Sequence, residues 1–201
     1  QSGVSFRNDV VETKAINIFN EGQNYVYSGA GVAIGDVNKD GLPDIFFSGN
    51  QLSSKLYINK GNLQFEDVSE KAGIKTNNWC TGTTMADVNG DGKPDLISAN
   101  VNSSNVTVLV NIGGGQFTPA SSPSVGSAPV KVIAADLNGD GKADLVSANS
   151  AQDTLSVLFN APSFTGTFIG DGSGLTLPGN IARLDANQTF TGKNIFSGLT
   201  Y

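Results

Sequence analysis

The 201-residue sequence contains no histidine and a single cysteine, Cys80. The absence of histidine excludes Ser-His-Asp and Cys-His nucleophile systems and every zinc site that needs an imidazole ligand. A lone cysteine excludes an intrachain disulfide and any paired-cysteine metal or redox motif. Because few catalytic arrangements remain without these groups, we expect a protein that is not an enzyme.

Positive charge and long apolar runs are also scarce. The chain has 12 Lys and Arg residues against 18 Asp and Glu residues, and its formal net charge is −6. This balance argues against nucleic acid or an anionic membrane as the main partner. No apolar run approaches the roughly 18 residues that a membrane-spanning helix needs, so no membrane insertion is expected.

What the sequence does contain is an acidic nonapeptide that occurs three times, at spacings of 51 and 49 residues. It reads DVNKDGLPD at residues 36–44, DVNGDGKPD at 87–95 and DLNGDGKAD at 136–144. A short apolar stretch precedes each copy, and a run typical of a strand follows it (IFFSGN, LISAN, LVSAN). Farther on, a second apolar run ends in an asparagine in each repeat: Asn59, Asn111 and Asn160.

Each repeat therefore indicates four short strands within about 50 residues, which is the periodicity of a propeller blade. We predict an all-β fold with about three four-stranded propeller-type blades over residues 1–165. Residues 166–201 depart from the pattern and are expected to form a β-rich strand-and-turn tail, a candidate inter-subunit strand. Residues 6–15 echo residues 65–72, which predicts that the chain begins on the outer strand of a blade.

The nonapeptide places oxygen-bearing side chains at positions 1, 3, 5 and 9. Alternate residues of a tight loop can converge on one point, and Gly at position 6 permits the reversal of the chain. The backbone carbonyl of position 7 faces the same centre. The candidate metal ligands are Asp36, Asn38, Asp40, Leu42 (carbonyl) and Asp44; Asp87, Asn89, Asp91, Lys93 (carbonyl) and Asp95; and Asp136, Asn138, Asp140, Lys142 (carbonyl) and Asp144.

These ligands are all hard oxygens, and five or more from the protein suit Ca²⁺ better than Mg²⁺. Nine of the 18 acidic residues lie in the three loops, and about three Ca²⁺ ions would cancel the net charge of −6. An EF-hand would need a bidentate Glu at position 12, where this chain has Phe47, Ser98 and Ser147. The loops are therefore not EF-hands.

With their flanks, the three loops resemble the FG-GAP/VCBS repeats of integrin-like β-propellers over roughly residues 1–165. The resemblance implies a calcium loop joining two strands of a blade, with the ninth-position Asp closing the ligand shell. It also implies a secreted or cell-surface protein. Residues 166–201 are similar to strand-and-turn segments of bacterial surface and tail-fibre proteins.

Three blades leave two open sheet edges, which are a liability in a soluble monomer. The chain could be part of a longer propeller, could close by association with other copies of itself, or could exchange strands with neighbours in a fibre. For strand exchange, the tail offers Phe190, Ile195 and Phe196 as residues that could enter a neighbour's groove.

Two functions remain open. The first is a non-catalytic, calcium-stabilised adhesion or binding module for a protein or glycan ligand. The second is a structural subunit of an extracellular fibre or surface appendage. No set of residues points to the third possibility, a calcium-dependent lyase or hydrolase.

Overall fold

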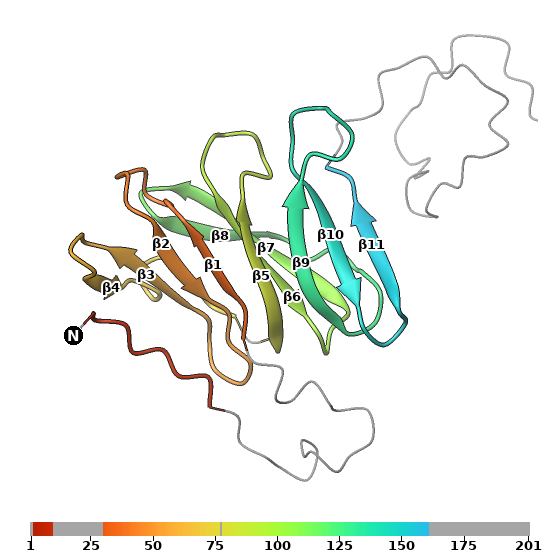
Figure 1. Cartoon of the computed structure of the whole chain (residues 1–201), viewed down its shortest axis with the longest axis horizontal. Coiled ribbons are helices and arrows are strands. Elements are labelled where there is room, and N and C mark those ends of the chain that lie inside the picture. Colours follow the sequence, from red (N-terminus) through yellow and green to blue (C-terminus); the bar gives the residue numbers. More distant parts are fainter. Residues whose placement is uncertain (1, 10–29, 77, 161–201) are drawn as a thin grey trace, which may run out of the picture. The chain divides into compact units, whose positions relative to one another are not determined.

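The computed structural model describes residues 2–9, 30–76 and 78–160, and all regular secondary structure within them is β (Figure 1). These residues all belong to one compact unit of the chain. Eleven strands form three antiparallel sheets, which we call blades 1, 2 and 3. The predicted all-β fold with three propeller-type blades is confirmed. The predicted tail at 166–201 lies outside the described residues.

The three blades follow one another along the chain, each built from consecutive strands. Blade 1 contains β1 (Val32–Gly35), β2 (Asp44–Phe47), β3 (Lys55–Asn59) and β4 (Phe65–Asp67). Blade 2 contains β5 (Cys80–Ala86), β6 (Asp95–Asn100), β7 (Asn105–Gly113) and β8 (Gln116–Ser121). Blade 3 contains β9 (Pro129–Ala135), β10 (Asp144–Asn149) and β11 (Thr154–Leu158). The inner strands β1, β5 and β9 lie side by side (Figure 1).

Strand β6 shows why these short sequences form stacked sheets. All six of its residues are buried, because blade 2 is covered on both faces. Successive side chains of a strand point to opposite faces of the sheet. Leu96 accordingly packs into a core shared with blade 1, whereas Ile97 and Ala99 pack into a core shared with blade 3.

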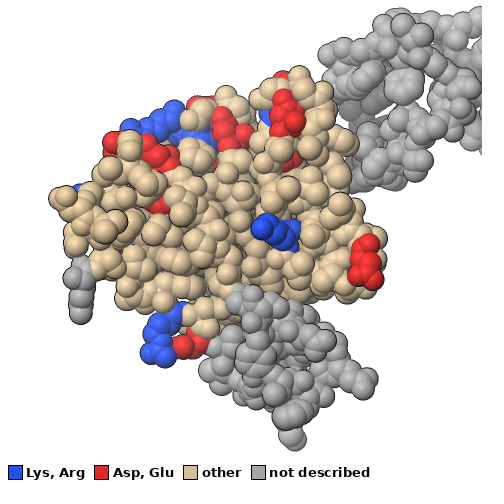
Figure 2. Space-filling model, viewed as in Figure 1, with Lys and Arg blue, Asp and Glu red and all other residues tan. Residues whose placement is uncertain are grey.

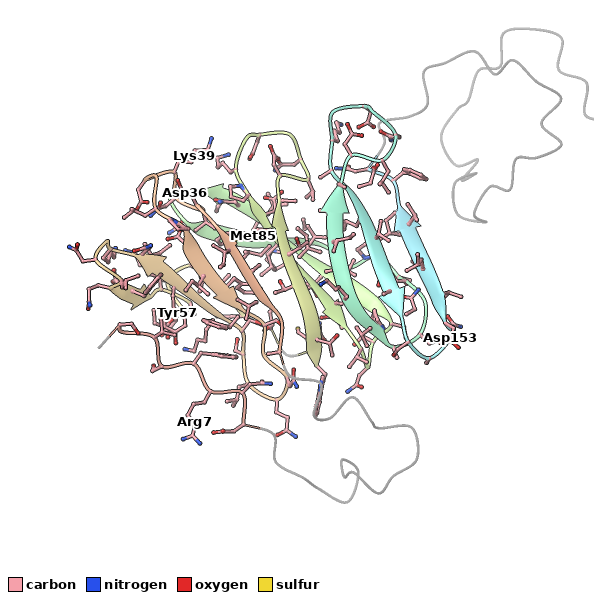
Figure 3. The ribbon with its side chains drawn as sticks, in the orientation of Figure 1. Arg7, Asp36, Lys39, Tyr57, Met85 and Asp153 are labelled. Atoms are coloured by element: carbon pink, nitrogen blue, oxygen red, sulfur yellow. The ribbon has the colours of Figure 1, made fainter. Side chains whose placement is uncertain are left out.

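Each pair of neighbouring blades encloses its own apolar core. The first core contains residues of blades 1 and 2 and of the connector between them: Val37, Phe46, Leu56, Ile58, Ala72, Ile74, Leu96, Leu109 and Phe117. Met85 packs against it and lies within the stack of blades (Figure 3). The second core joins blades 2 and 3: Ile97, Ala99, Val106, Val108, Val132 and Leu145. Blade-to-blade packing, rather than any single sheet, therefore supplies the apolar burial that stabilises the fold.

The structure departs from the sequence-based expectation in two places. Blade 3 has three strands among the described residues, where four were predicted, so β11 has no strand partner on its outer side there. Residues 6–9, expected to start an outer strand, are not in a strand. Instead, the Phe6 ring stacks on Phe47 with centroids 4.8 Å apart, and the Asn8 side-chain oxygen accepts a hydrogen bond from the Asn50 backbone. At residues 6–9, packing of Phe6 on Phe47 thus takes the place of the predicted strand.

We predict that Ile97→Ala lowers the free energy of unfolding by about 2–5 kcal/mol, because it leaves a cavity in the second core. The same substitution at Ile112, which is 59% exposed on β7, serves as the control and should change stability by less than about 0.5 kcal/mol. Urea unfolding of both variants in saturating calcium measures the difference. Equal effects at the two positions would contradict the assignment of the second core.

Candidate metal centre

The three acidic loops connect the first and second strands of their blades and lie at the same end of the sheets. Residues 36–44 link β1 to β2, residues 87–95 link β5 to β6, and residues 136–144 link β9 to β10. Figure 2 shows acidic side chains gathered along this edge, where Asp36 is seen in Figure 3. The edge carries nine carboxylates from three loops.

Within each loop, positions 1, 3, 5 and 7 are bound into one tight turn. In the first loop, the Asp40 backbone N–H donates to Asp36 Oδ1 at 3.1 Å and to Asn38 Oδ1 at 3.0 Å. Those two oxygens share a donor and therefore lie close together. The Asp40 carboxylate in turn accepts from the Leu42 backbone N–H at 2.9 Å. The other loops repeat the contact between positions 3 and 5 and that between positions 5 and 7.

The turn needs left-handed backbone at two positions. Position 6 is glycine in all three loops, and its φ is 87° at Gly41 and 84° at Gly141, as the sequence predicts. Position 4 is also left-handed, which the sequence analysis missed. There φ is 62° at Lys39 and 78° at Gly90 and Gly139. Glycine at this position in two of the three copies was the signal that could have revealed it.

The ninth-position Asp anchors each loop to its blade. Asp44, Asp95 and Asp144 are all fully buried. In blade 2, Asp95 accepts one hydrogen bond from the Val88 backbone at 2.9 Å and another from the Asn111 backbone at 2.8 Å. The same two contacts recur in the other blades. This carboxylate therefore ties the start of the loop to the end of the third strand.

Burial and hydrogen bonding act on these carboxylates in opposite directions. Burial raises the pKa of Asp44 and of Asp95 above the ordinary value, partly opposed by the two backbone donors that each receives. At two exposed carboxylates, those of Asp91 and Asp136, the balance favours ionisation. The Lys93 ammonium, 2.6 Å from the carboxylate, lowers the pKa of Asp91, and backbone donors led by Gly141 lower that of Asp136.

The asparagine near the end of the third strand connects one loop to the next, a role that sequence reasoning did not assign. The Asn111 side chain is fully buried, and its amide donates to the Pro94 carbonyl of its own blade at 3.1 Å. The same amide donates to the Val37 carbonyl in the acidic loop of blade 1 at 2.8 Å. Asn160 repeats both contacts with Ala143 and Val88. The recurrence of Asn at this position was the available signal.

The donor set suits a hard cation, but not through carboxylates alone. Among the described residues, no three Asp, Glu, His or Cys side chains converge into one metal-binding group. Both oxygens of each ninth-position Asp already accept backbone hydrogen bonds, although a carboxylate oxygen can accept more than one contact. A cation in a loop would therefore draw on the position 3 amide oxygen and the position 7 carbonyl as well. This mixture of oxygens is the kind that Ca²⁺ accepts.

Cys80 has a structural environment. It is fully buried, its sulfur lies 3.3 Å from Asn100 Oδ1, and burial raises the pKa of its thiol. A protonated, buried thiol is a poor nucleophile.

Comparison with known proteins identifies the repeat. The FG-GAP-like repeat matches residues 36–98 and 87–147, and each match begins at the first Asp of an acidic loop. Cartilage acidic protein 1 of Mus musculus is 31% identical over 112 residues, and that of Xenopus tropicalis is 32% identical over 82 residues. The aligned stretches cover 54% and 40% of this chain. They cover only 17% and 13% of those relatives, so the chain matches less than a fifth of their length.

We predict that Asn111→Ala destabilises the protein by about 1–3 kcal/mol, because it leaves the buried carbonyl of Val37 and the half-buried carbonyl of Pro94 without their donor. Asn59→Ala is the matched control in dilute protein, since the Asn59 amide donates only to the Pro43 carbonyl of its own blade among the described residues. Its cost should be at least 1 kcal/mol smaller. Chemical denaturation of both variants in the same buffer tests this; a cost for Asn59→Ala as large as that for Asn111→Ala would contradict the blade-to-blade role.

Proposed function

The chain belongs to the FG-GAP-like repeat family, and from this premise we propose that it is an extracellular, calcium-binding, non-catalytic adhesion or binding module. The observation that carries the proposal is the threefold recurrence of one oxygen-rich turn, with the same backbone contacts at the same end of each blade. Acidic turns of unrelated purpose have no reason to repeat in register.

In each loop, the proposed ligands are the side chains of positions 1, 3, 5 and 9 and the carbonyl of position 7. In the second loop these are Asp87, Asn89, Asp91, the Lys93 carbonyl and Asp95. A bound Ca²⁺ supplies positive charge where three carboxylates otherwise repel one another. The residues of the chain hold the oxygens in place through the backbone N–H groups of the turn.

The proposed role of the ion is to rigidify. The loops are coupled from blade to blade through Asn111 and Asn160, so holding one loop also restrains its neighbour. By mass action, calcium at 100 times its dissociation constant adds about 2.7 kcal/mol of stability per site. A stiff row of loops and blades suits a surface that binds a protein or glycan partner.

An extracellular location is proposed because calcium modules with weak sites operate at the millimolar calcium found outside cells. The similarity to cartilage acidic protein 1 is compatible with this location. No helix among the described residues is long and apolar enough to cross a membrane.

We predict that the chain binds about three Ca²⁺ ions and that excess chelator lowers its melting temperature. Loss of about 2.7 kcal/mol per site corresponds to roughly 5–10 °C for each site in a chain of this size. Isothermal titration calorimetry counts the ions, and thermal unfolding with and without chelator measures the shift. An unchanged melting temperature in chelator would remove the basis for the calcium role.

Asp40→Asn tests a single loop, because it removes one carboxylate while preserving the size of the side chain. We expect the first loop to lose roughly tenfold or more in calcium affinity, and the other two to retain theirs. Asp153→Asn is the matched control, since Asp153 is exposed at the opposite end of blade 3 from the acidic loop (Figure 3). Asparagine tolerates the left-handed backbone at this position, where φ is 49°. Equal losses in both variants would point to a general charge effect.

A second candidate function is favoured by the outer edge of blade 3. Blades 1 and 2 have four strands, whereas β11 has no fourth-strand partner among the described residues. An open edge can accept a strand from another chain. The chain would then be a structural subunit of an extracellular fibre or surface appendage, assembled by strand exchange.

Removal of residues 187–201, which include Phe190, Ile195 and Phe196, tests the fibre alternative. If this segment is the exchanged strand, its loss should convert large particles into single chains, as measured by light scattering in millimolar calcium. Calcium stoichiometry serves as the folding control, since the three loops lie outside the deleted segment. An unchanged particle size would exclude this segment as the exchanged strand.

A further inference from the structure

A hydrogen bond from an asparagine side chain to the acidic loop of the preceding blade forms twice among the described residues. The equivalent acceptor in the loop of blade 3 has no such donor there. Asn111 of blade 2 donates to the Val37 carbonyl of blade 1, and Asn160 of blade 3 donates to the Val88 carbonyl of blade 2. Val37 and Val88 hold the second position of their acidic loops, which is Leu137 in blade 3. Within residues 2–9, 30–76 and 78–160, no side chain donates to the Leu137 carbonyl.

The equivalent asparagine of blade 1 is a donor that has no acceptor in a preceding blade among the described residues. Asn59 of blade 1 is the counterpart of Asn111 and, like it, donates to the carbonyl of loop position 8, here Pro43 at 3.0 Å. In the described part of the chain, Asn59 forms no bond to a preceding blade, and it is half-buried where Asn111 is fully buried. Donor and acceptor of one blade-to-blade contact thus stand at opposite ends of the stack.

The outer face of blade 3 repeats the faces that blades 1 and 2 bury against their successors. Val146 of blade 3 is equivalent to Phe46 of blade 1 and Ile97 of blade 2, each two residues after the ninth-position Asp. Val157 is likewise equivalent to Leu56 and Val108, each three residues before the asparagine of the third strand. The earlier residues are at most 5% exposed. On blade 3, Val146 is half-buried, and four other large apolar side chains of this surface are exposed: Leu137 by 51%, Leu155 by 71%, Val157 by 42% and Phe159 by 54%.

Blade 1 exposes the complementary surface. Met85 and Ala134 lie two residues before their acidic loops and pack against the core shared with the preceding blade. Their counterpart Ile34 is 65% exposed, and Val32 beside it on the same face is 53% exposed. Blade 1 therefore presents an apolar face of the kind that blades 2 and 3 bury against a predecessor.

The N-terminal segment occupies the place of a blade connector. The Phe65 backbone N–H donates to the Ser2 carbonyl at 2.7 Å, as Phe117 donates to Ala72 at 2.9 Å. The glycines that follow, Gly3 and Gly73, have φ of 82° and 79°. The connector around Ala72 packs in the core between blades 1 and 2, alongside residues of both blades. A segment in the matching place on blade 1 is therefore compatible with a blade docked there, and Phe6, which stacks on Phe47 beside Val32, would be part of that contact.

We propose that a second copy of this chain docks head to tail, with blade 1 of one copy packed on the outer face of blade 3 of the other. In this contact the Asn59 amide donates to the Leu137 carbonyl, continuing the series formed by Asn111 and Asn160. A blade of this chain is the occupant that fits, because the two faces repeat both sides of an interface that the chain already forms twice. The proposal goes beyond calcium binding, and it uses the face of β11, whereas strand exchange would use its edge.

Such a contact joins two different surfaces, so repeated copies close into a ring or extend into a filament. The described residues of each copy then contribute three blades. Two copies supply six, within the range of four to eight blades found in closed propellers.

The test uses two charged variants of the full chain in saturating calcium, Val157→Lys on the blade 3 face and Ile34→Lys on the blade 1 face. Both sites are exposed, so folding should be retained, as circular dichroism and calcium stoichiometry would verify. By sedimentation velocity, the unmodified chain should exceed the mass of one chain with rising concentration, and each variant alone should remain a single chain. An equimolar mixture should form one-to-one dimers, because each variant retains the face that the other lacks.

Leu63→Lys is the control, since Leu63 is 77% exposed in the turn between β3 and β4, and it should associate like the unmodified chain. Asn59→Ala should weaken association about two- to tenfold through loss of one hydrogen bond. A single-chain mass for the unmodified protein would overturn the proposal, whether another part of the chain or a different protein covers the faces. Variants that associate as well as the unmodified chain, or a mixture that stays monomeric, would overturn it too, while leaving the calcium role untouched.

Discussion

The structure of every blade depends on one buried carboxylate, the ninth-position Asp of its acidic loop. Asp95 is fully excluded from solvent, yet it joins the second residue of the loop to Asn111, near the end of the third strand, through two backbone hydrogen bonds. A buried carboxylate is costly unless it is hydrogen-bonded or neutralised. The two backbone donors offset part of this cost, and the raised pKa shows that they do not offset all of it. A cation held by the same loop would offset the rest of the cost of burying this carboxylate. The stability of the blade would then depend on the chemistry of its loop.

The asparagine near the end of the third strand extends this dependence from one blade to the next. Its backbone is held by the buried carboxylate, and its side-chain amide reaches the acidic loop of the preceding blade. Loop, carboxylate and asparagine therefore form a continuous row along one edge of the stack. The apolar cores between blades supply most of the burial, but they are not directional. The polar row fixes the position of each blade relative to its neighbour, since a shift would leave buried donors and acceptors unpaired.

Much of the fold could be predicted from the sequence because its signals are local. Short apolar runs that recur around each acidic loop predicted the strands, and the loops lie between the first and second strands as expected. Glycine at position 6 correctly indicated left-handed backbone. The same conformation at Lys39 was missed, because a lysine carries no such signal by itself. The N-terminal segment was assigned to a strand on its similarity to residues 65–72, whereas its contacts are those of the connector around Ala72 and Gly73. The loop oxygens lie in the predicted turn, and the calcium ions themselves remain a prediction.

The sequence by itself determined the repeat, its strands, and the chemistry of the loops. Each of these is encoded within nine to about fifty consecutive residues, in turn geometry, short apolar runs and ligand type. Only the tertiary structure decided which faces are covered, that the ninth-position Asp is buried, and that Asn111 bonds to Val37, 74 residues away. Such contacts depend on how separate sheets pack, and a single side chain has no preference for one distant partner until the stack brings the two together. For the same reason, the Asn59 amide and the Leu137 carbonyl lie at the two ends of the stack, although the equivalent groups of the other blades are hydrogen-bonded to each other.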